Sequence, residues 1–150
     1  MHTVYIIEDE EILQNLLSTF LETVLPDIQL LGMTGDGREG IEQCLKLRPD
    51  LAIVDIHLAE ISGLEILQQL KSKLPQTKIL IFSGNTAHQS IKIAVQSKAD
   101  GFINKISGLA ELEKAIQAVT RGEQYFSPEI YDQVVRIREA KRTGPRSPSL

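Results

Sequence analysis

The chain has 150 residues, of which 42% are apolar, and a formal net charge of −4, which suits one domain with a core of ordinary size and argues against disorder. No apolar run approaches the about 20 residues that cross a bilayer, and the first residues, MHTVYIIEDEE, lack the basic-then-apolar order of a signal peptide. The single cysteine, Cys44, excludes an internal disulfide and a cysteine-based metal site, so we expect a cytoplasmic protein with no membrane partner.

Short apolar runs alternate along the chain with amphipathic stretches. We predict buried strands at residues 3–7, 28–34, 51–54, 78–82 and 102–103. We predict helices at residues 10–25, from the turn at 35–37 to about 47, and at 63–73, 86–97 and 107–121. The apolar runs are short and do not alternate strictly with polar residues, which is typical of a parallel sheet covered on both faces. The five βα units therefore predict a doubly wound α/β fold.

The pattern changes after Gly122. Ser127-Pro128 is a typical helix start, with a Ser N-cap and Pro at the first helical position. An apolar stripe follows at helical spacing, formed by Ile130, Val134 and Ile137. We expect this helix to fade near Ala140 and the last residues, KRTGPRSPSL, to be a flexible tail. The stripe either joins two copies in a homodimer, contacts a further domain or packs on its own domain.

Charge is spread unevenly over the chain. From Val134 onwards there are five basic residues and one acid, a net charge of +4, so the remainder carries −8. An acidic body does not suit nucleic-acid binding. We interpret the basic end as a solvated linker rather than a contact to DNA or RNA.

Candidate site residues follow four of the five predicted strands. They are Glu8 and Asp9 after the first strand, Asp55 after the third, Ser83 and Gly84 after the fourth, and Lys105 after the fifth. Ligands of open α/β sheets bind at the carboxyl ends of the strands, so these groups are expected to meet at one edge. Clustered carboxylates repel one another unless a pKa rises or a cation lies among them. All-oxygen ligands favour a hard ion, and Mg²⁺ fits this set.

Such a site suits phosphoryl transfer. With a bound Mg²⁺, Asp55 would act as a carboxylate nucleophile and form an aspartyl phosphate. Lys105 and the Ser83 hydroxyl would stabilise the phosphoryl oxygens.

The set Glu8-Asp9, Asp55, Ser83, Phe102 and Lys105, within the strings VYIIEDE, LAIVDIHLAEISGLEIL, ILIFSGN and ADGFINK, resembles the receiver domain of two-component response regulators over about residues 2–123. The resemblance implies a flavodoxin-like, five-stranded parallel sheet in the order 2-1-3-4-5 with five helices, followed here by a C-terminal linker helix. We therefore assign residues 1–123 to a receiver domain and residues 124–150 to the linker helix and tail.

The resemblance also implies a role for each matching residue. Asp55 is the phosphoacceptor, and its donor is a sensor histidine kinase. The implied Mg²⁺ ligands are Asp9 directly, Glu8 through water, Asp55 and the backbone carbonyl of His57. Ser83, Gly84, Lys105 and His57 would contact the phosphate, with the His57 side chain at the rim controlling access of water. Ser83 and Phe102 would form the two-state switch that reshapes the face made by the fourth helix, fifth strand and fifth helix.

The sequence departs from the family pattern at two positions. Glu8 stands where Asp is commoner, and Ile106 follows Lys105 where the family usually has proline. The second departure puts in doubt the path of the loop that carries Lys105.

The strings ADGFINK and RGEQYFSPEI resemble the subclass that carries a LuxR-type helix-turn-helix DNA-binding domain. No such domain is present in this chain, and we favour an excised receiver over a natural single-domain protein. Transcription would then be the output, and DNA would be bound only through the absent C-terminal domain.

Three other functions compete with a phosphorylation switch. A haloacid-dehalogenase-like phosphatase also uses Asp, Mg²⁺, Ser/Thr and Lys, but it places its nucleophile after the first strand as D-x-D, where this chain reads Glu8-Asp9-Glu10. An interaction module that works without phosphorylation would not need the complete acid set. A flavodoxin-like nucleotide carrier would need small residues in the first loop to bind the FMN phosphate, and that loop is acidic.

Overall fold

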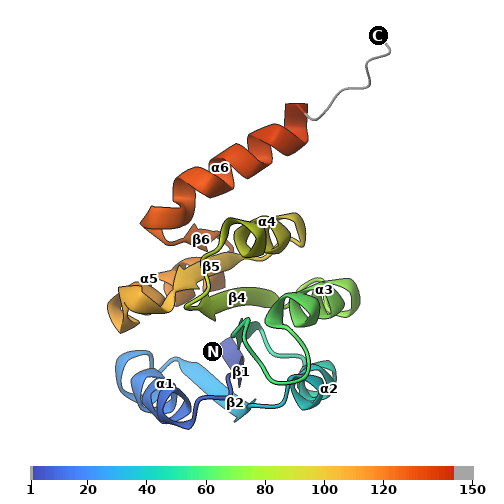
Figure 1. Cartoon of the computed structure of the whole chain (residues 1–150). Coiled ribbons are helices and arrows are strands. Elements are labelled where there is room, and N and C mark those ends of the chain that lie inside the picture. Colours follow the sequence, from blue (N-terminus) through green and yellow to red (C-terminus); the bar gives the residue numbers. More distant parts are fainter. Residues whose placement is uncertain (1, 144–150) are drawn as a thin grey trace.

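A six-stranded parallel sheet in the order β2-β1-β3-β4-β5-β6 forms the centre of the molecule, which the computed structural model describes over residues 2–143 (Figure 1). The strands are β1 (His2–Ile7), β2 (Ile28–Thr34), β3 (Leu51–Val54), β4 (Lys78–Ser83), β5 (Gly101–Asn104) and β6 (Tyr125–Phe126). The predicted order of the first five strands is confirmed. A short sixth strand, which we did not predict, pairs with β5 and extends the sheet.

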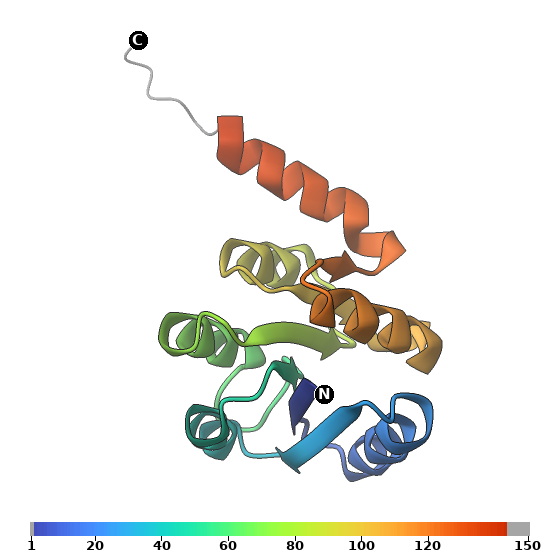
Figure 2. The ribbon, with the colours of Figure 1, turned by 180° about the vertical axis from the view of Figure 1, so that it is seen from behind.

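Helices cover both faces of the sheet. They are α1 (Glu11–Val24), α2 (Gly37–Leu47), α3 (Gly63–Lys73), α4 (His88–Gln96), α5 (Leu109–Thr120) and α6 (Pro128–Thr143). Helices α1 and α5 lie on one face, and α2, α3 and α4 lie on the other (Figures 1 and 2). Successive strand residues point to opposite faces, so Ile6 packs in the core beneath α1 and α5 while Ile7 packs in the core beneath α2, α3 and α4.

The register of the strands brings their carboxyl ends to one edge. Ile7 of β1 lies beside Val54 of β3, and Ser83 of β4 lies beside Asn104 of β5. The residues that follow β1, β3 and β5 therefore emerge at the same edge as the end of β4. This edge is where the sequence predicts the functional site.

Two helices begin two residues later than predicted, for local reasons. Helix α4 begins at His88 rather than near Thr86, because the Asn85 side chain accepts a hydrogen bond from the Ala87 N–H at 3.0 Å and holds a turn before the helix. Helix α5 begins at Leu109 rather than at Ser107. A 3₁₀ turn at Lys105–Ser107, followed by Gly108 with a φ of +84°, separates it from β5. A positive φ is a conformation that glycine adopts without steric cost.

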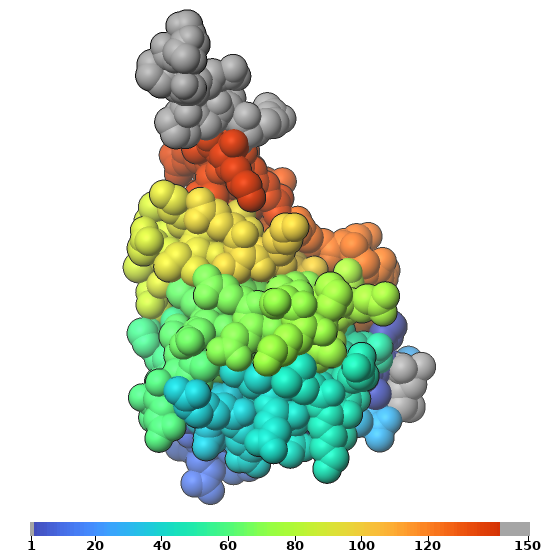
Figure 3. Space-filling view, turned by 90° about the vertical axis from the view of Figure 1, so that its right-hand side faces the viewer, coloured from blue at the N-terminus to red at the C-terminus, as the bar shows by residue number. Residues whose placement is uncertain are grey.

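Helix α6 packs on its own domain, which is one of the three arrangements the sequence left open. Its stripe of Ile130, Val134 and Ile137 is buried in the same core as Phe102 and Phe126. The helix continues to Thr143, beyond the predicted end near Ala140, and the tail after residue 143 lies outside the described residues. Seen from the side of α2, α3 and α4, these helices and α6 form one continuous stack (Figure 3).

Within residues 2–143, no helix combines the length and the apolar composition needed to span a bilayer.

Candidate functional site

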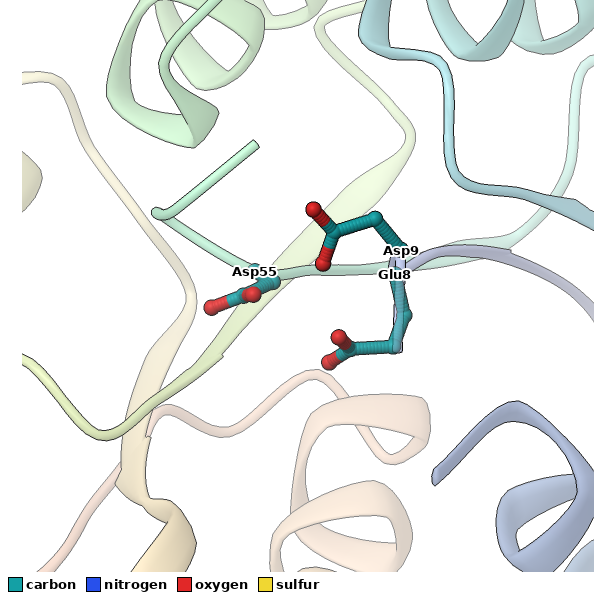
Figure 4. Close-up of side chains that lie close together, drawn as sticks. All are labelled: Glu8, Asp9 and Asp55. Carbon is teal, nitrogen blue, oxygen red and sulfur yellow. The ribbon is translucent and has the colours of Figure 1, made fainter. Parts of the chain in front are cut away.

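Three carboxylates gather at the carboxyl edge of the sheet. Glu8 and Asp9 come from the loop after β1, Asp55 comes from the loop after β3, and all three side chains point to the same side (Figure 4). Each contributes a carboxylate oxygen, and these oxygens lie within 4.8 Å of one another. Glu8 and Asp55 are only 2% and 5% exposed, whereas Asp9 is exposed. Two of the three charges are thus largely removed from water, which is unfavourable unless a cation lies close by.

Lys105 supplies one such cation. Its Nζ lies 2.9 Å from Glu8 Oε1 and 3.3 Å from Asp55 Oδ2, so a single ammonium group bridges both buried carboxylates. Burial by itself would lower the pKa of Lys105, but its hydrogen bond to Glu8 and the negative charges of Asp55 and Glu8 outweigh burial and raise the pKa above the ordinary value. Lys105 therefore carries its positive charge at neutral pH.

Glu8 is held on both of its oxygens. Oε1 pairs with Lys105, and Oε2 accepts a hydrogen bond from the Glu10 N–H at 3.1 Å. Burial nevertheless raises the pKa of Glu8 above its usual range, against the lowering effect of the Lys105 hydrogen bond and with a further rise from the charge of Asp55. The Glu8 backbone is fixed as well, because its N–H donates to Thr34 and its carbonyl accepts from the Gln14 side chain.

Asp55 has one oxygen without a partner. Oδ2 contacts Lys105, whereas Oδ1 is buried and has no hydrogen-bond partner within the described part of the chain. A buried acceptor left without a donor costs free energy. A divalent cation among Glu8, Asp9 and Asp55 would remove this cost, so these residues fit a metal ion with oxygen ligands.

The loop after Asp55 turns back tightly against the start of α3. The Gly63 N–H donates to the Ile56 carbonyl at 2.9 Å, and a Cβ at Gly63 would lie 1.9 Å from the Asp55 carbonyl oxygen. Only a residue without a side chain fits there. Gly63 is therefore a positioning residue for the Asp55 loop, a role that we did not predict from the sequence.

The other predicted site residues differ in exposure, and Ser83, Gly84 and His57 lie at the same edge as the acid cluster. Ser83 is fully buried at the end of β4, and its Oγ accepts a hydrogen bond from the Asn85 N–H at 3.0 Å. Gly84 and His57 are exposed. Phe102 is fully buried in the core that also contains the α6 stripe. The structure thus joins Glu8, Asp9, Asp55 and Lys105 by short distances, with Ser83 at the adjacent strand end.

The loop after β5 carries Lys105 into the site with Ile106 in the position after it. Asn104 Oδ1 accepts a hydrogen bond from the Ile106 N–H at 3.0 Å, and the Ile106 side chain is exposed. Proline has no N–H to offer at that position. The path of the loop that carries Lys105 is therefore fixed by a local turn. This turn uses the Ile106 N–H, a group that proline does not have.

A buried polar pair that sequence reasoning missed links this loop to α6. The Asn104 N–H donates to Ser127 Oγ at 3.0 Å, and the Ser127 N–H donates to the Phe102 carbonyl at 3.0 Å. Ser127 is fully buried and immediately precedes α6. The residue before Lys105 is thus hydrogen-bonded to the residue before α6, across 23 positions of sequence.

Comparison with known proteins identifies the family to which the chain belongs. The family model described as response regulator receiver domain matches residues 4–117. Among curated proteins, the response regulator protein VraR of Staphylococcus aureus is 29% identical over 127 residues, which cover 85% of this chain and 60% of VraR. The chain therefore spans about 60% of the length of the curated relatives it matches.

Solved structures share the fold. A LuxR-family two-component response regulator from Aurantimonas matches with a TM-score of 0.84 and 23% identity, over 93% of this chain and 99% of that chain. The isolated REC domain of RcsB from Salmonella enterica, solved with the phosphomimetic BeF3⁻, matches with a TM-score of 0.79 and 19% identity, over 91% and 97% of the two chains. At these identities the likeness concerns the fold alone.

Proposed function

Because the chain belongs to the response regulator receiver domain family, whose members are signalling proteins of two-component systems, we propose that it is a phosphorylation-dependent switch in which Asp55 accepts the phosphoryl group. One observation carries the proposal: Asp55 is a buried carboxylate at a strand end, with Lys105 Nζ 3.3 Å from one oxygen and no hydrogen-bond partner for the other among the described residues. Asp55 supplies the nucleophile, and the ammonium group of Lys105 beside it supplies a positive charge that stabilises the incoming phosphoryl oxygens.

The transfer is a substitution at phosphorus. A carboxylate oxygen of Asp55 attacks the phosphorus of a phosphohistidine on a sensor histidine kinase, the P–O bond forms, and the P–N bond breaks as the imidazole leaves with a proton. The Lys105 ammonium group and the Ser83 hydroxyl stabilise the phosphoryl oxygens. Gly84 and His57, exposed beside the site, complete the proposed phosphate contacts.

We propose Mg²⁺ as the metal of the acid cluster. Glu8, Asp9, Asp55 and the His57 carbonyl would hold it, with Glu8 acting through water. When bound, it would offset the negative charge that otherwise repels a dianionic phosphoryl group. Before phosphorylation, Lys105 already neutralises part of this charge through Glu8 and Asp55.

The signal would pass from Ser83 and Phe102 to the face made by α4, β5 and α5. Ser83 lies beside Asn104 in the sheet, and Phe102 shares its core with the buried stripe of α6. A change at Ser83 therefore has a short physical route to α6. We propose transcription as the output, through a DNA-binding domain outside this chain. One solved structure with a similar fold is described as a DNA-binding response regulator of the LuxR family from Staphylococcus aureus.

The test compares Asp55→Asn with the wild type and with Asp27→Asn, a matched change at an exposed acid outside the site. Each protein is incubated with Mg²⁺ and acetyl phosphate or phosphoramidate, and its intact mass is measured. We expect one phosphoryl group on the wild type and on Asp27→Asn, none on Asp55→Asn, and none on any of them when Mg²⁺ is chelated. An unchanged wild-type mass, or an equal gain on Asp55→Asn, would contradict the proposal, and steady hydrolysis of many phosphate esters would favour a phosphatase instead.

A further inference from the structure

A basic cleft of about 580 Å³ lies at the opposite edge of the sheet from the acid cluster. Its charged walls are Lys71, Lys78, Lys98, Asp100, Arg138 and Lys141. Lys78 begins β4 and Asp100 precedes β5, so the cleft sits at the amino ends of these parallel strands, whereas Glu8, Asp9 and Asp55 follow the carboxyl ends. The proposed phosphorylation chemistry uses none of these residues.

The positive charge of the basic cleft is not balanced by its one acid. Asp100 Oδ2 already pairs with Lys71 Nζ at 2.6 Å and accepts a hydrogen bond from the Ile79 N–H at 2.8 Å, while Oδ1 lies 4.0 Å from Lys78 Nζ. Five cationic side chains face a single carboxylate, so the walls carry a net charge of +4. The whole chain carries −4, which makes this a local concentration of positive charge in an acidic protein.

Arg138 is held in place at this cleft. Its guanidinium carbon lies 5.3 Å from the centroid of the Phe126 ring, and its Nη2 donates to the Gln124 side chain at 2.6 Å. A stacked and hydrogen-bonded guanidinium loses less conformational freedom when it binds an anion than a free one does. The arrangement favours phosphate or carboxylate recognition at this wall.

Lys98 occupies a costly backbone conformation. Its φ is +67°, in the left-handed region, at the end of α4 where glycine is the usual residue. A side chain there costs free energy, so the charge of Lys98 is placed in the cleft at the expense of stability.

We infer that the basic cleft binds a small organic polyphosphate of nucleotide size. Several cations grouped in one concave site match a ligand with several negative charges, and Arg and Lys are the side chains that recognise phosphate. The volume lies in the range of small-molecule sites. Pro75, Val95 and Ile137 add apolar wall that inorganic phosphate would not use.

The ligand would bridge two helices. Val95 and Lys98 belong to α4 and the turn that ends it, whereas Ile137, Arg138 and Lys141 belong to α6. A bound polyphosphate would therefore hold α6 against α4. This inference goes beyond the proposed function and does not depend on it, because the two sites lie at opposite edges of the sheet.

The test is calorimetric titration of the full chain with ATP and with inorganic triphosphate, without divalent cations, so that neither probe binds through metal at the acid cluster. The variant Lys98→Gln/Lys141→Gln is compared with Lys46→Gln/Lys114→Gln, which removes the same charge from exposed positions outside the cleft. We expect saturable binding to the wild type, a loss of affinity of about tenfold or more in the cleft variant, and little change in the control. Lys141→Gln alone, at an exposed residue, serves if the double variant does not fold.

Three results would overturn the inference. In the first, neither ATP nor triphosphate binds saturably to the wild type. In the second, the control variant loses as much affinity as the cleft variant. In the third, the cleft variant keeps the full affinity of the wild type. ATP binding more tightly than triphosphate supports the contribution of the apolar wall. Equal affinity for the two probes would overturn the organic part of the inference and leave a polyphosphate site.

Discussion

A single methyl group is enough to disturb the Asp55 loop, because Gly63 faces the Asp55 carbonyl with no free space. We expect Gly63→Ala to lower the free energy of unfolding by about 3 kcal/mol, since relief of the clash requires the backbone to move. The matched change Gly84→Ala places its methyl group in open space and is expected to change stability by about 0.5 kcal/mol or less. Urea denaturation measures both, and equal stability of the two variants would show that the loop can yield.

Glu8 gives the stability of the protein a pH dependence of defined sign. Burial raises its folded-state pKa above the unfolded value. The folded state therefore binds the proton of Glu8 more tightly than the unfolded state does. This preference stabilises the protein fully below the unfolded pKa, and the contribution is lost as pH rises through the folded pKa. Without divalent cations, we therefore expect the wild type to lose stability relative to Glu8→Gln as pH rises from about 4.5 towards neutrality. Urea midpoints of the two proteins at several pH values test this. A midpoint of Glu8→Gln that does not rise relative to the wild type as pH rises would refute the assigned cause.

At the scale of elements, Ser127 connects the end of β5 to α6. Ser127→Ala removes the acceptor of the Asn104 N–H and leaves that buried donor unpaired, which costs about 1–3 kcal/mol. We expect faster hydrogen exchange in α6 as well as lower stability. Ser72→Ala is the control, because Ser72 is an exposed serine on α3, outside β5 and α6. If α6 exchanges equally in both variants, the hydrogen bond does not couple β5 to α6.

Sequence reasoning succeeded for elements whose signals are local. The apolar runs and their bounding prolines and glycines predicted five strands, and the parallel arrangement then predicted that Glu8, Asp9, Asp55 and Lys105 meet. It failed where the determining contact is remote. Strand β6 has only two residues, too few for any periodicity, and it exists because its backbone pairs with β5.

The positions of Asn104 and Ser127 show the same limit at the site. Neither residue type signals a buried contact by itself, and their hydrogen bond joins positions 23 residues apart. Gly63 was visible as a helix start, but the need for glycine follows from the Asp55 carbonyl, which only the folded loop brings close. Local pattern predicts elements, whereas tertiary packing decides these contacts.

At the scale of the whole molecule, the boundary predicted after residue 123 can be tested directly. A chain ending at residue 123 loses β6 and the buried side chains Ile130, Val134 and Ile137, and it uncovers the core around Phe102. From the apolar area involved, we expect a loss of stability on the order of 5 kcal/mol. A chain ending at residue 143 retains these contacts and serves as the control. Thermal unfolding compares them, and equal midpoints would make residues 1–123 an independent domain.

The two-residue length of β6 has a consequence for behaviour at high concentration. An uncovered β5 would present a row of backbone N–H and C=O groups, on which a strand from another molecule can add and begin aggregation. Here the Tyr125 and Ser127 N–H groups donate to the Asp100 and Phe102 carbonyls at 3.1 and 3.0 Å, so this row is already occupied. Because β6 is so short and is closely followed by Pro128 and α6, the β6 edge of the sheet offers little template for growth.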